Sequence, residues 1–409
     1  MEEWKEYKLG EVVISVKDRI TTSVLNASSY ISTENMLPNK AGVTLSSGVP
    51  SGNAIKFVAD DILISNIRPY FKKIWQADRI GGCSSDVICL RATNITEPIY
   101  LYYLLSQDRF FDYVMQGTKG TKMPRGDRSQ IMQWPVLLPS KDKQKKIASI
   151  LKYLDDKIEV NRKINENLEQ QAQALFKSWF VDFEPFKNGE FVESELGMIP
   201  KGWRVERIED LSQKMASGGT PKSLNKDYYL GNIKWYSTKE LKDCFLFDSE
   251  KHISEDALKN SSAKMFPEGT VLMAIYASPT VGRLGILTNP ATFNQAAVGI
   301  VPKENVGSEF IYLSLLSERT NLNNLASGAA QQNLNVGIVK NYNILVPEQK
   351  ALDRFNRLAR SYFLLLKKNT EESRCLAELR DTLLPKLMSG ELKVTNMDLV
   401  NEMLEKGIR

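Results

Sequence analysis

The chain has 409 residues and a formal net charge of +5, with 42% hydrophobic and 25% charged residues. This composition excludes wholesale disorder, a collagen-like chain and a disulfide scaffold. No run of about 18 uncharged apolar residues occurs, and the charged N-terminus lacks a signal-like apolar core, so we expect neither a membrane span nor export. The length predicts two or three folding units.

Cysteine and histidine content narrows the possible chemistry. Cys83, Cys89, Cys244 and Cys375 form no CxxC pair, so we expect reduced thiols in a cytoplasmic protein. His252 is the single histidine and lies in a charged stretch, where we expect it at the surface. Zinc spacings, phosphate-binding and dinucleotide-binding glycine motifs and the Asn/Asp-Pro-Pro-aromatic motif of amino-methyltransferases are absent. We therefore expect a non-catalytic chain without metal or cofactor, while a nuclease-type carboxylate cluster stays open.

The first third of the chain predicts a mixed globular unit. Short apolar runs at 12–16, 61–65 and 87–90 predict strands, with turn residues between them. The apolar spacing at 100–114 suits a helix. We expect residues 1–139 to form an α+β unit.

A long helix is predicted next. Residues 144–183 contain neither glycine nor proline, and their apolar positions follow a 4-3 spacing that is typical of a coiled coil. We expect this helix to span 140–183. Glycine and proline content then predicts a linker at 184–202.

The second half predicts the same order of elements. A strand-like run at 270–276 lies within a second α+β unit, expected at 203–347. A second long helix is expected at 348–390, ending or kinking at Pro385, because proline removes a helical hydrogen bond. A charged tail follows at 391–409.

The two halves repeat each other at an offset of about 208 residues. The matches keep the same order along the chain, which indicates domain duplication. Small drifts in the offset indicate loop insertions between shared elements. The matching pairs include Trp4 and Trp203, Phe57 and Phe266, Leu104 and Leu315, Gly117 and Gly328, and Pro139 and Pro347.

The repeat extends to the two long helices. Asn161 and Asn369 occupy equivalent seam positions, and a buried seam asparagine fixes register and orientation at a cost in stability. We expect an antiparallel pair in which these two residues face each other. The same arrangement places Leu154 near Leu376 and Ile147 near Leu383. The alternative is two unrelated amphipathic helices, each packed on its own unit.

Three segments resemble the specificity subunit of type I restriction–modification systems. Ala174–Phe183 is similar to the central conserved region of that family, Leu379–Leu392 to its C-terminal conserved region, and Ile199–Trp203 to the entry into its second recognition domain. The resemblance covers nearly the whole chain. It implies two target recognition domains separated by two long antiparallel coiled-coil helices, reading a bipartite target in double-stranded DNA.

The resemblance also implies a division of labour among subunits. The helices would set the distance between half-sites and bind two methyltransferase subunits, and restriction/translocase subunits would join the complex. Methylation, translocation and cleavage would then belong to partner chains. The recognised bases cannot be carried over, because the recognition domains vary widely within the family.

Candidate DNA contacts lie in loops that supply cations for phosphates and polar groups for base edges. Gln and Asn can pair bidentately with adenine, and Arg with guanine. The alternative for each loop is a solvated surface segment. In the first unit the candidates are Arg68, Lys72, Lys119, Lys122, Arg125 and Arg128. In the second unit they are Lys222, Lys226, Ser278, Thr280, Arg283, Gln331, Gln332 and Asn333.

Large apolar side chains crowd one end of each long helix, beyond what the seam requires. They are expected either to bind a helix of a methyltransferase subunit or to cover the ends of the coiled coil. Pseudo-twofold symmetry predicts two equivalent partner sites. Two rival functions are a self-contained nuclease or methyltransferase, and a scaffold for two proteins without DNA. The partner candidates are Phe176, Trp179, Phe180, Leu384 and Leu387.

Overall fold

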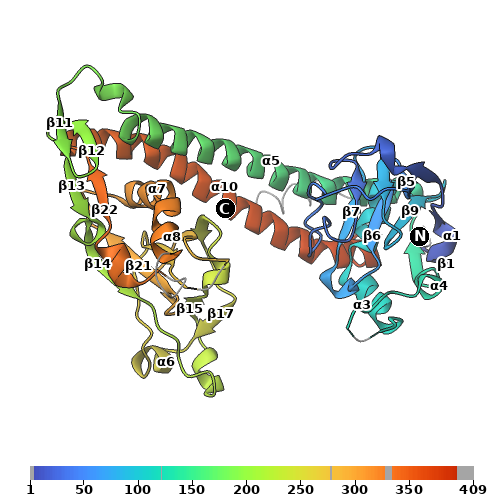
Figure 1. Ribbon diagram of the computed structural model, residues 1–409. Coiled ribbons are helices and arrows are strands. Elements are labelled where there is room, and N and C mark those ends of the chain that lie inside the picture. The colour runs from blue at the N-terminus through green and yellow to red at the C-terminus, as the bar shows by residue number, and fades with distance from the viewer. Residues whose placement is uncertain (1–3, 121, 277–278, 328–333, 394–409) are drawn as a thin grey trace. The chain divides into compact units, whose positions relative to one another are not determined.

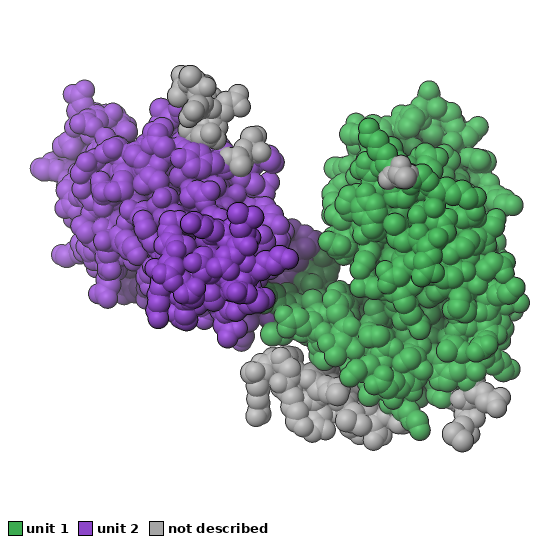
Figure 2. All heavy atoms as spheres, turned by 90° about the horizontal axis from the view of Figure 1, so that it is seen from below, with its two compact units in different colours: residues 1–159, 373–409 green, residues 160–372 purple. Residues whose placement is uncertain are grey.

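A computed structural model describes residues 4–120, 122–276, 279–327 and 334–393 (Figure 1). The chain divides into two compact units, which Figure 2 colours separately. Unit 1 contains residues 1–159 and 373–409, and unit 2 contains residues 160–372. The long helices α5 (Lys141–Phe180) and α10 (Gln349–Ser389) each contribute one part to either unit. None of the helices within the described ranges is long and apolar enough to span a membrane.

Unit 1 is built on two four-stranded sheets, ordered β2-β9-β6-β7 and β3-β5-β8-β4, and on the pair β1-β10. The central strand β6 is buried along its whole length, which explains its unbroken apolar run. The strands are β1 (Lys5–Lys8), β2 (Val13–Ser15), β3 (Arg19–Thr21), β4 (Tyr30–Ile31), β5 (Asn53–Phe57), β6 (Ile62–Ser65), β7 (Ile74–Gln76), β8 (Gly81–Cys83), β9 (Val87–Ala92) and β10 (Pro135–Leu138).

Short helices cover the first of these sheets. The main core of unit 1 joins strand residues such as Ile62 to Tyr100 of α2, to Leu151 of α5 and to Leu384 of α10. The long helices are therefore part of the core of this unit. The short helices are α1 (Leu9–Val12), η1 (Thr22–Val24), η2 (Pro69–Phe71), α2 (Pro98–Leu105), α3 (Asp108–Gln116) and α4 (Arg128–Ile131).

Unit 2 has a five-stranded sheet ordered β14-β21-β18-β19-β16 and a three-stranded sheet ordered β17-β15-β20. The pair β13-β22 and the hairpin β11-β12 complete its strands, and this hairpin lies within the segment 184–202. The strands are β11 (Phe191–Ser194), β12 (Gly197–Pro200), β13 (Arg204–Arg207), β14 (Ser212–Ser217), β15 (Ile233–Tyr236), β16 (Cys244–Leu246), β17 (Lys251–Ile253), β18 (Val271–Ala274), β19 (Leu284–Leu287), β20 (Thr292–Phe293), β21 (Ala297–Pro302) and β22 (Asn343–Val346).

The last three short helices of unit 2, α7, α8 and α9, follow the order of α2, α3 and α4 in unit 1. The main core joins Phe310 of α7 to Phe180 of α5 and Phe355 of α10. The helical segments are η3 (Glu184–Phe186), η4 (Ile208–Leu211), η5 (Lys226–Tyr229), η6 (Thr238–Glu240), α6 (Glu255–Lys259), α7 (Ser308–Ser317), α8 (Arg319–Ser327) and α9 (Val336–Lys340).

Strand register confirms the duplication. Ile62 of β6 pairs with Leu90 of β9, and Val271 of β18 pairs with Ile300 of β21, so the same two central strands occur in each unit with the same partner positions. The outer pairs also correspond, since β1 pairs with β10 as β13 pairs with β22. The repeat predicted from the sequence is therefore a repeat of sheet topology.

The helix pair is antiparallel, as predicted. Within unit 2, Asn165 of α5 hydrogen-bonds to Thr370 of α10 at 3.1 Å. Further toward the end of α5, Phe180 packs on Phe355, which comes earlier in α10, with ring centroids 4.7 Å apart. Figure 1 shows α5 and α10 side by side. The chain direction along the two helices is therefore opposite.

One helix boundary differs from the prediction. We expected Pro385 to end or kink the second long helix; it does not end it, because α10 continues past this residue to Ser389. Leu387 and Met388 beyond the proline are 1% and 0% exposed, and both belong to the core of unit 1. Burial of this last turn stabilises it despite the missing proline hydrogen bond.

Candidate nucleic-acid interface

The interface candidate of unit 1 lies where β6 ends and β9 begins. The Asn66 N–H, just after β6, donates to the Asp86 carbonyl, just before β9, at 2.9 Å. The loop 66–73 leaves the sheet at this edge and closes with the 3₁₀ turn η2. Arg68 and Lys72 flank that turn in the left-handed region, with φ of 49° and 50°. This rare backbone conformation holds both candidate cations at the ends of one tight turn.

A second loop, 117–128, packs against the first. The Arg68 N–H donates to the Pro124 carbonyl at 2.8 Å, and the Gly126 N–H donates to the Asn66 carbonyl at 3.2 Å. Reciprocal main-chain hydrogen bonds of 3.0 Å between Lys119 and Arg125 close this loop into a narrow hairpin. The structure thus brings together the two cationic loops of unit 1.

Several cations of this edge already have partners within unit 1. Arg125 lies 3.3 Å from the Asp86 carboxylate, and Arg128 donates to the Ser85 carbonyl at 2.6 Å. A guanidinium carries five N–H donors, so these contacts leave donors free for an incoming ligand. The contacts fix the direction of both arginine side chains toward the 84–86 turn.

The lysines of the second loop differ from each other. Lys119 pairs with Asp127 at 2.9 Å. Its hydrogen bond, together with those from the main chain of Gln130 and Ser129, lowers the pKa of Asp127. Lys122 is exposed and has no ion-pair partner among the described residues. Lys122 is therefore the cation of this loop that is most open to a phosphate.

A further cation, Lys40, joins the edge and was missed by sequence reasoning. Lys40 and Lys72 both pair with Asp108, at 3.1 and 2.9 Å. Burial alone would raise the pKa of Asp108, but the hydrogen bonds from the two lysines lower it. The turn around Pro38 and Gly42 was the available signal, although nothing in the sequence linked it to Lys72.

Unit 2 presents the equivalent edge. The Ile275 N–H, just after β18, donates to the Ala296 carbonyl, just before β21, at 2.8 Å. The loop after β18 closes through Gly282, whose φ of 83° favours glycine, and through a 3.0 Å hydrogen bond from the Arg283 N–H to the Thr280 carbonyl. Arg283 is half-buried and has no side-chain partner within the described ranges.

The polar candidates of this loop were Thr280 and Ser278, and the structure describes only Thr280. Thr280 is 9% exposed, and its hydroxyl donates to the Tyr276 carbonyl at 3.3 Å, so it stabilises the loop from inside. Tyr276 itself is 37% exposed at the same edge and was missed from the sequence. Ser278 lies outside the described residues.

The segment after β14 reaches the same edge of unit 2. The Thr220 hydroxyl donates to the side chain of Gln295, in the turn before β21. Lys222 and Lys226 follow and are exposed, without an ion pair in the part of the chain that the structure describes. Gln295 is a further polar group that the sequence did not single out.

Only the residues that follow the neutral loop of unit 2 are described. Gln331, Gln332 and Asn333 lie outside the described residues. Asn335, two residues after Asn333, caps α9 by accepting from the Ile338 N–H at 2.9 Å, as Asp127 caps α4 in unit 1. Asn335 therefore occupies the position in unit 2 that Asp127 occupies in unit 1.

The apolar side chains expected at a partner surface lie largely inside the units. Phe176, Trp179 and Phe180 are only 6–7% exposed and belong to the core of unit 2. Leu384 and Leu387 are 6% and 1% exposed in the core of unit 1. Two roles were expected for these side chains, binding a partner helix or covering the ends of the coiled coil. Their packing fits the second role, because Phe355 and Trp203 contact the three aromatic rings. Phe176 also lines a surface cavity of 330 Å³.

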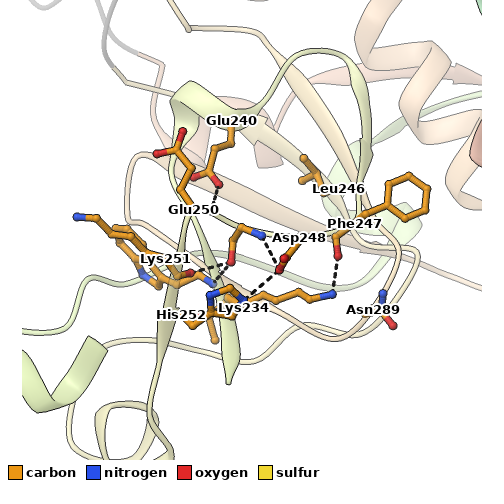
Figure 3. Close-up of polar contacts among 12 residues, drawn as sticks. Lys234, Glu240, Leu246, Phe247, Asp248, Glu250, Lys251, His252 and Asn289 are labelled. Atoms are coloured by element: carbon orange, nitrogen blue, oxygen red, sulfur yellow. Dashed lines mark hydrogen bonds and ion pairs between the residues drawn. The ribbon is translucent and has the colours of Figure 1, made fainter. Parts of the chain in front are cut away.

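The single histidine has a local partner. His252 of β17 lies 3.0 Å from the Asp248 carboxylate, and neighbouring Lys234 donates to the Phe247 carbonyl (Figure 3). Burial alone would raise the pKa of Asp248, but hydrogen bonds from the Ser249 main chain and His252 lower it. Among the described residues, no group of three or more His, Cys, Asp and Glu is arranged to hold a metal ion.

A duplicated α+β unit on an antiparallel helix pair, with a cation-bearing loop edge in each copy, defines a two-headed recognition protein. A family model for the type I restriction modification DNA specificity domain matches residues 1–170 and 200–372. The chain belongs to this family of type I restriction–modification specificity subunits. Such subunits are non-catalytic and supply DNA sequence recognition to the restriction–modification complex.

Individual relatives agree with this assignment. The chain is 28% identical to the HindI specificity subunit of Haemophilus influenzae, covering 96% of this chain and 100% of that protein. It is 33% identical to the MjaIX specificity subunit of Methanocaldococcus jannaschii, covering 73% and 70%. The crystal structure of a type I S subunit from M. genitalium shares the fold, with a TM-score of 0.56 at 15% identity over 94% and 96% of the two chains.

Proposed function

We propose that each unit reads one half of a bipartite double-stranded DNA target through the loop edge at the ends of its two central strands. One observation carries this proposal. The hydrogen bond from Asn66 to Asp86 in unit 1 has its equivalent in the bond from Ile275 to Ala296 in unit 2, and candidate loops gather around both. A duplicated protein that presents the same edge twice suits a target with two parts.

In unit 1 the reading edge combines the loops 66–73 and 117–128. Lys122 is assigned to a phosphate, because it is exposed and without an ion pair in the described part of the chain. Arg125 and Arg128 are assigned to base edges, since their directions are fixed by Asp86 and Ser85. The remaining phosphate contacts of this unit are assigned to Arg68, Lys72 and Lys119.

In unit 2 the cations are fewer and less paired. Lys222 and Lys226 are assigned to phosphates because they are exposed and have no ion pair within the described ranges. The half-buried Arg283 is also assigned to a phosphate, because its side chain has no partner within those ranges. Polar side chains that pair with adenine are assigned to the loop before Asn335. These polar candidates are Ser278, Gln331, Gln332 and Asn333.

The boundaries of the recognition domains and spacer helices are assigned on the basis of this proposal. Target recognition domains are assigned to 1–139 and 203–347, and spacer helices to 140–183 and 348–390. The spacers would bind two methyltransferase subunits, one for each copy of the repeat. The methyltransferase subunits would pack on exposed leucines of α10 and on the cavity beside Phe176. They are Leu358, Leu364 and Leu365, at 42%, 62% and 49% exposure.

The full assembly would include restriction/translocase subunits and act on cytoplasmic DNA. The four cysteines, which are free thiols in this structure, support that location. A methylation map tests the central proposal. The chain is expressed with its modification subunit in a host without the system, and modified adenines are read across the genome.

The expected result is a split motif with an unspecified gap. Exchange of residues 1–139 for those of a relative should change one half of the motif, and exchange of 203–347 should change the other. An assembled complex that adds no methylation at any motif would contradict the proposal and favour a scaffold without DNA. A motif in which both halves change with one exchanged unit would contradict the division between units.

A further inference from the structure

The segment between β14 and η5 presents an apolar side chain to solvent. Leu224 is 98% exposed and Leu230 is 77% exposed, the two largest values among the exposed large apolar side chains that the structure describes. Single apolar residues at a surface are common and by themselves need no explanation. Three features of Leu224, however, argue for a function. They are the rigidity of its turn, its position beside the loop edge of unit 2 and the charge of its neighbouring lysines.

Leu224 lies at the tip of a hydrogen-bonded turn. The Asn225 N–H donates to the Lys222 carbonyl at 3.1 Å, which closes the turn around the leucine. The Tyr229 hydroxyl donates to the Pro221 carbonyl at 2.9 Å and ties the two ends of the segment together. The leucine is therefore held outward by a fixed backbone, so ordering it on binding costs little entropy.

The turn packs on a small hydrophobic core that is separate from the main core of unit 2. The Trp235 indole N–H donates to the Gly219 carbonyl at 2.9 Å, and its ring packs edge-on against Tyr229, with centroids 6.2 Å apart. Within the described residues, unit 2 has three core clusters and unit 1 has two, and this is the additional one. Its buried residues are Trp235, Ile253, Ala257 and Ala263.

The turn also lies beside the reading edge of unit 2. Thr220 at its base contacts Gln295, in the turn before β21 to which the loop after β18 is bonded. Lys222 and Lys226 on either side of Leu224 are exposed, without ion pairs in the described part of the chain. An apolar side chain between two exposed lysines is complementary to the apolar part of a base edge that lies between two phosphates.

We propose that Leu224 is a specificity-determining residue that packs against the 5-methyl group of a thymine in the major groove, while Lys222 and Lys226 hold adjacent phosphates. The inference rests on the proposed function and adds a base identity to it. The methyl of thymine is the apolar group on the major-groove edge. A turn whose ends lie within about 7 Å fits a groove about 12 Å wide, whereas the minor groove is about 6 Å wide.

Unit 1 repeats the arrangement on a different loop. Met123 is 50% exposed and lies between Lys122 and Arg125. The reciprocal hydrogen bonds of Lys119 and Arg125, both 3.0 Å, close that loop below it. The same combination of an apolar tip and flanking cations therefore occurs at both reading edges, on unrelated segments.

The test uses the full chain in complex with its modification subunits and the target found by methylation mapping. Each thymine of the second half-site is replaced in turn by deoxyuridine, which lacks only the 5-methyl group. Wild-type complex should bind about fourfold more weakly at one of these positions, the factor expected for one buried methyl-sized group. Leu224→Ala should bind both duplexes equally, with an unchanged melting temperature because the side chain is exposed.

A matched control is Leu196→Ala, in the turn of the β11-β12 hairpin, where the leucine is 51% exposed. It should keep the wild-type preference for thymine. A second half-site without thymine, equal binding of thymine and uracil duplexes by wild-type complex, or a preserved preference in Leu224→Ala each overturns the inference. Equal weakening of Leu224→Ala on target and scrambled duplexes also overturns it. Wild-type complex that does not prefer its target over a scrambled duplex overturns the proposed function instead.

Discussion

The side-chain amide of Asn161 on α5 donates a 3.4 Å hydrogen bond to the main-chain carbonyl of Asn369 on α10, 208 residues further along the chain. It also donates to the Glu372 carboxylate at 2.8 Å. Asn369 in turn donates to Asn165 at 3.0 Å. Two residues equivalent by the repeat therefore meet within one polar layer of the helix pair, and this layer fixes the register of the antiparallel helices in unit 2.

Asn161→Ala should lower the free energy of unfolding by about 1–3 kcal/mol. Asn161 is only 2% exposed, and its loss leaves partly buried acceptors on α10 without this donor. Urea denaturation measures the change. Gln170→Ala, on the exposed face of the same helix, is the control and should change stability by less than about 0.5 kcal/mol. Equal effects of the two variants would contradict a structural role for the polar layer.

A partly buried ion pair joins the helices within unit 1. Arg380 donates to Asp155 at 2.6 Å, and the Tyr103 hydroxyl donates to the other oxygen of the same carboxylate, also at 2.6 Å. Burial alone would lower the pKa of Arg380, but the charge of Asp155 raises it. Arg380→Met should cost about 1–3 kcal/mol, because the Asp155 charge then lacks its cation.

The control for this pair lies on the same arginine. Asp381, 61% exposed, contacts Arg380 at 2.8 Å from the solvent side. Asp381→Asn should change the free energy of unfolding by less than about 0.5 kcal/mol, as is usual for exposed pairs. A larger loss of stability for Asp381→Asn than for Arg380→Met in thermal or urea denaturation would contradict the stabilising role of the Arg380–Asp155 pair.

Tyr100→Phe should leave the stability at neutral pH unchanged or higher. Tyr100 is fully buried, and its hydroxyl has no hydrogen-bond partner among the described residues. Phe310 is the third residue of α7, as Tyr100 is of α2, so the repeat itself uses phenylalanine at this place. Urea denaturation at pH 8 should give a free energy of unfolding at least equal to that of the wild type.

The same residue makes a prediction about alkaline pH. Burial raises the pKa of Tyr100 above its ordinary value of 10.0. Above pH 10 the unfolded chain releases this proton while the folded chain keeps it, so wild-type stability falls as pH rises, by up to about 1.4 kcal/mol per pH unit for one group. Tyr100→Phe should lose stability less steeply between pH 10 and 11. Identical slopes would count against burial of a neutral phenol.

Gly219→Ala should lower the free energy of unfolding by about 1–3 kcal/mol, because an added Cβ would lie 2.1 Å from the main-chain oxygen of Ser262. Gly48→Ala is the matched control, since nothing lies within 4 Å of a Cβ there. Thermal denaturation of both variants measures the difference. A Gly219 variant as stable as the Gly48 variant would show that the base of the Leu224 segment is less tightly packed than described.

Lys122→Ala should weaken DNA binding to all sequences alike and reduce the salt slope of log affinity by about 1, the value for one lost phosphate contact. Binding of the assembled complex is measured at several salt concentrations. Lys187→Ala, which removes an exposed lysine paired with Glu184, should leave the slope unchanged. An unaltered slope in Lys122→Ala would remove this residue from the interface.

Local patterns in the sequence were sufficient for the duplication, the two long helices and their antiparallel pairing. The 4-3 apolar spacing and the equivalence of Asn161 and Asn369 depend on positions a few residues apart, or on one constant offset, so they are readable without a structure. Leu154, Leu376, Ile147 and Leu383 do fall in one core cluster of unit 1. The candidate loops 68–73 and 117–130 were proposed from their composition, and their contact with DNA stays a prediction.

The tertiary structure decided how these parts meet and which side chains remain available. Main-chain hydrogen bonds between residues far apart in sequence bring Arg68 to Pro124, and no local pattern encodes such a pair. Burial placed Thr280 inside its loop and Phe176 in a core, although both residue types also occur at surfaces. Conversely, the sequence did not single out Leu224, and only its exposure on a hydrogen-bonded turn made it a candidate reader. Exposure depends on the packing of the whole unit, which residue type and spacing cannot specify.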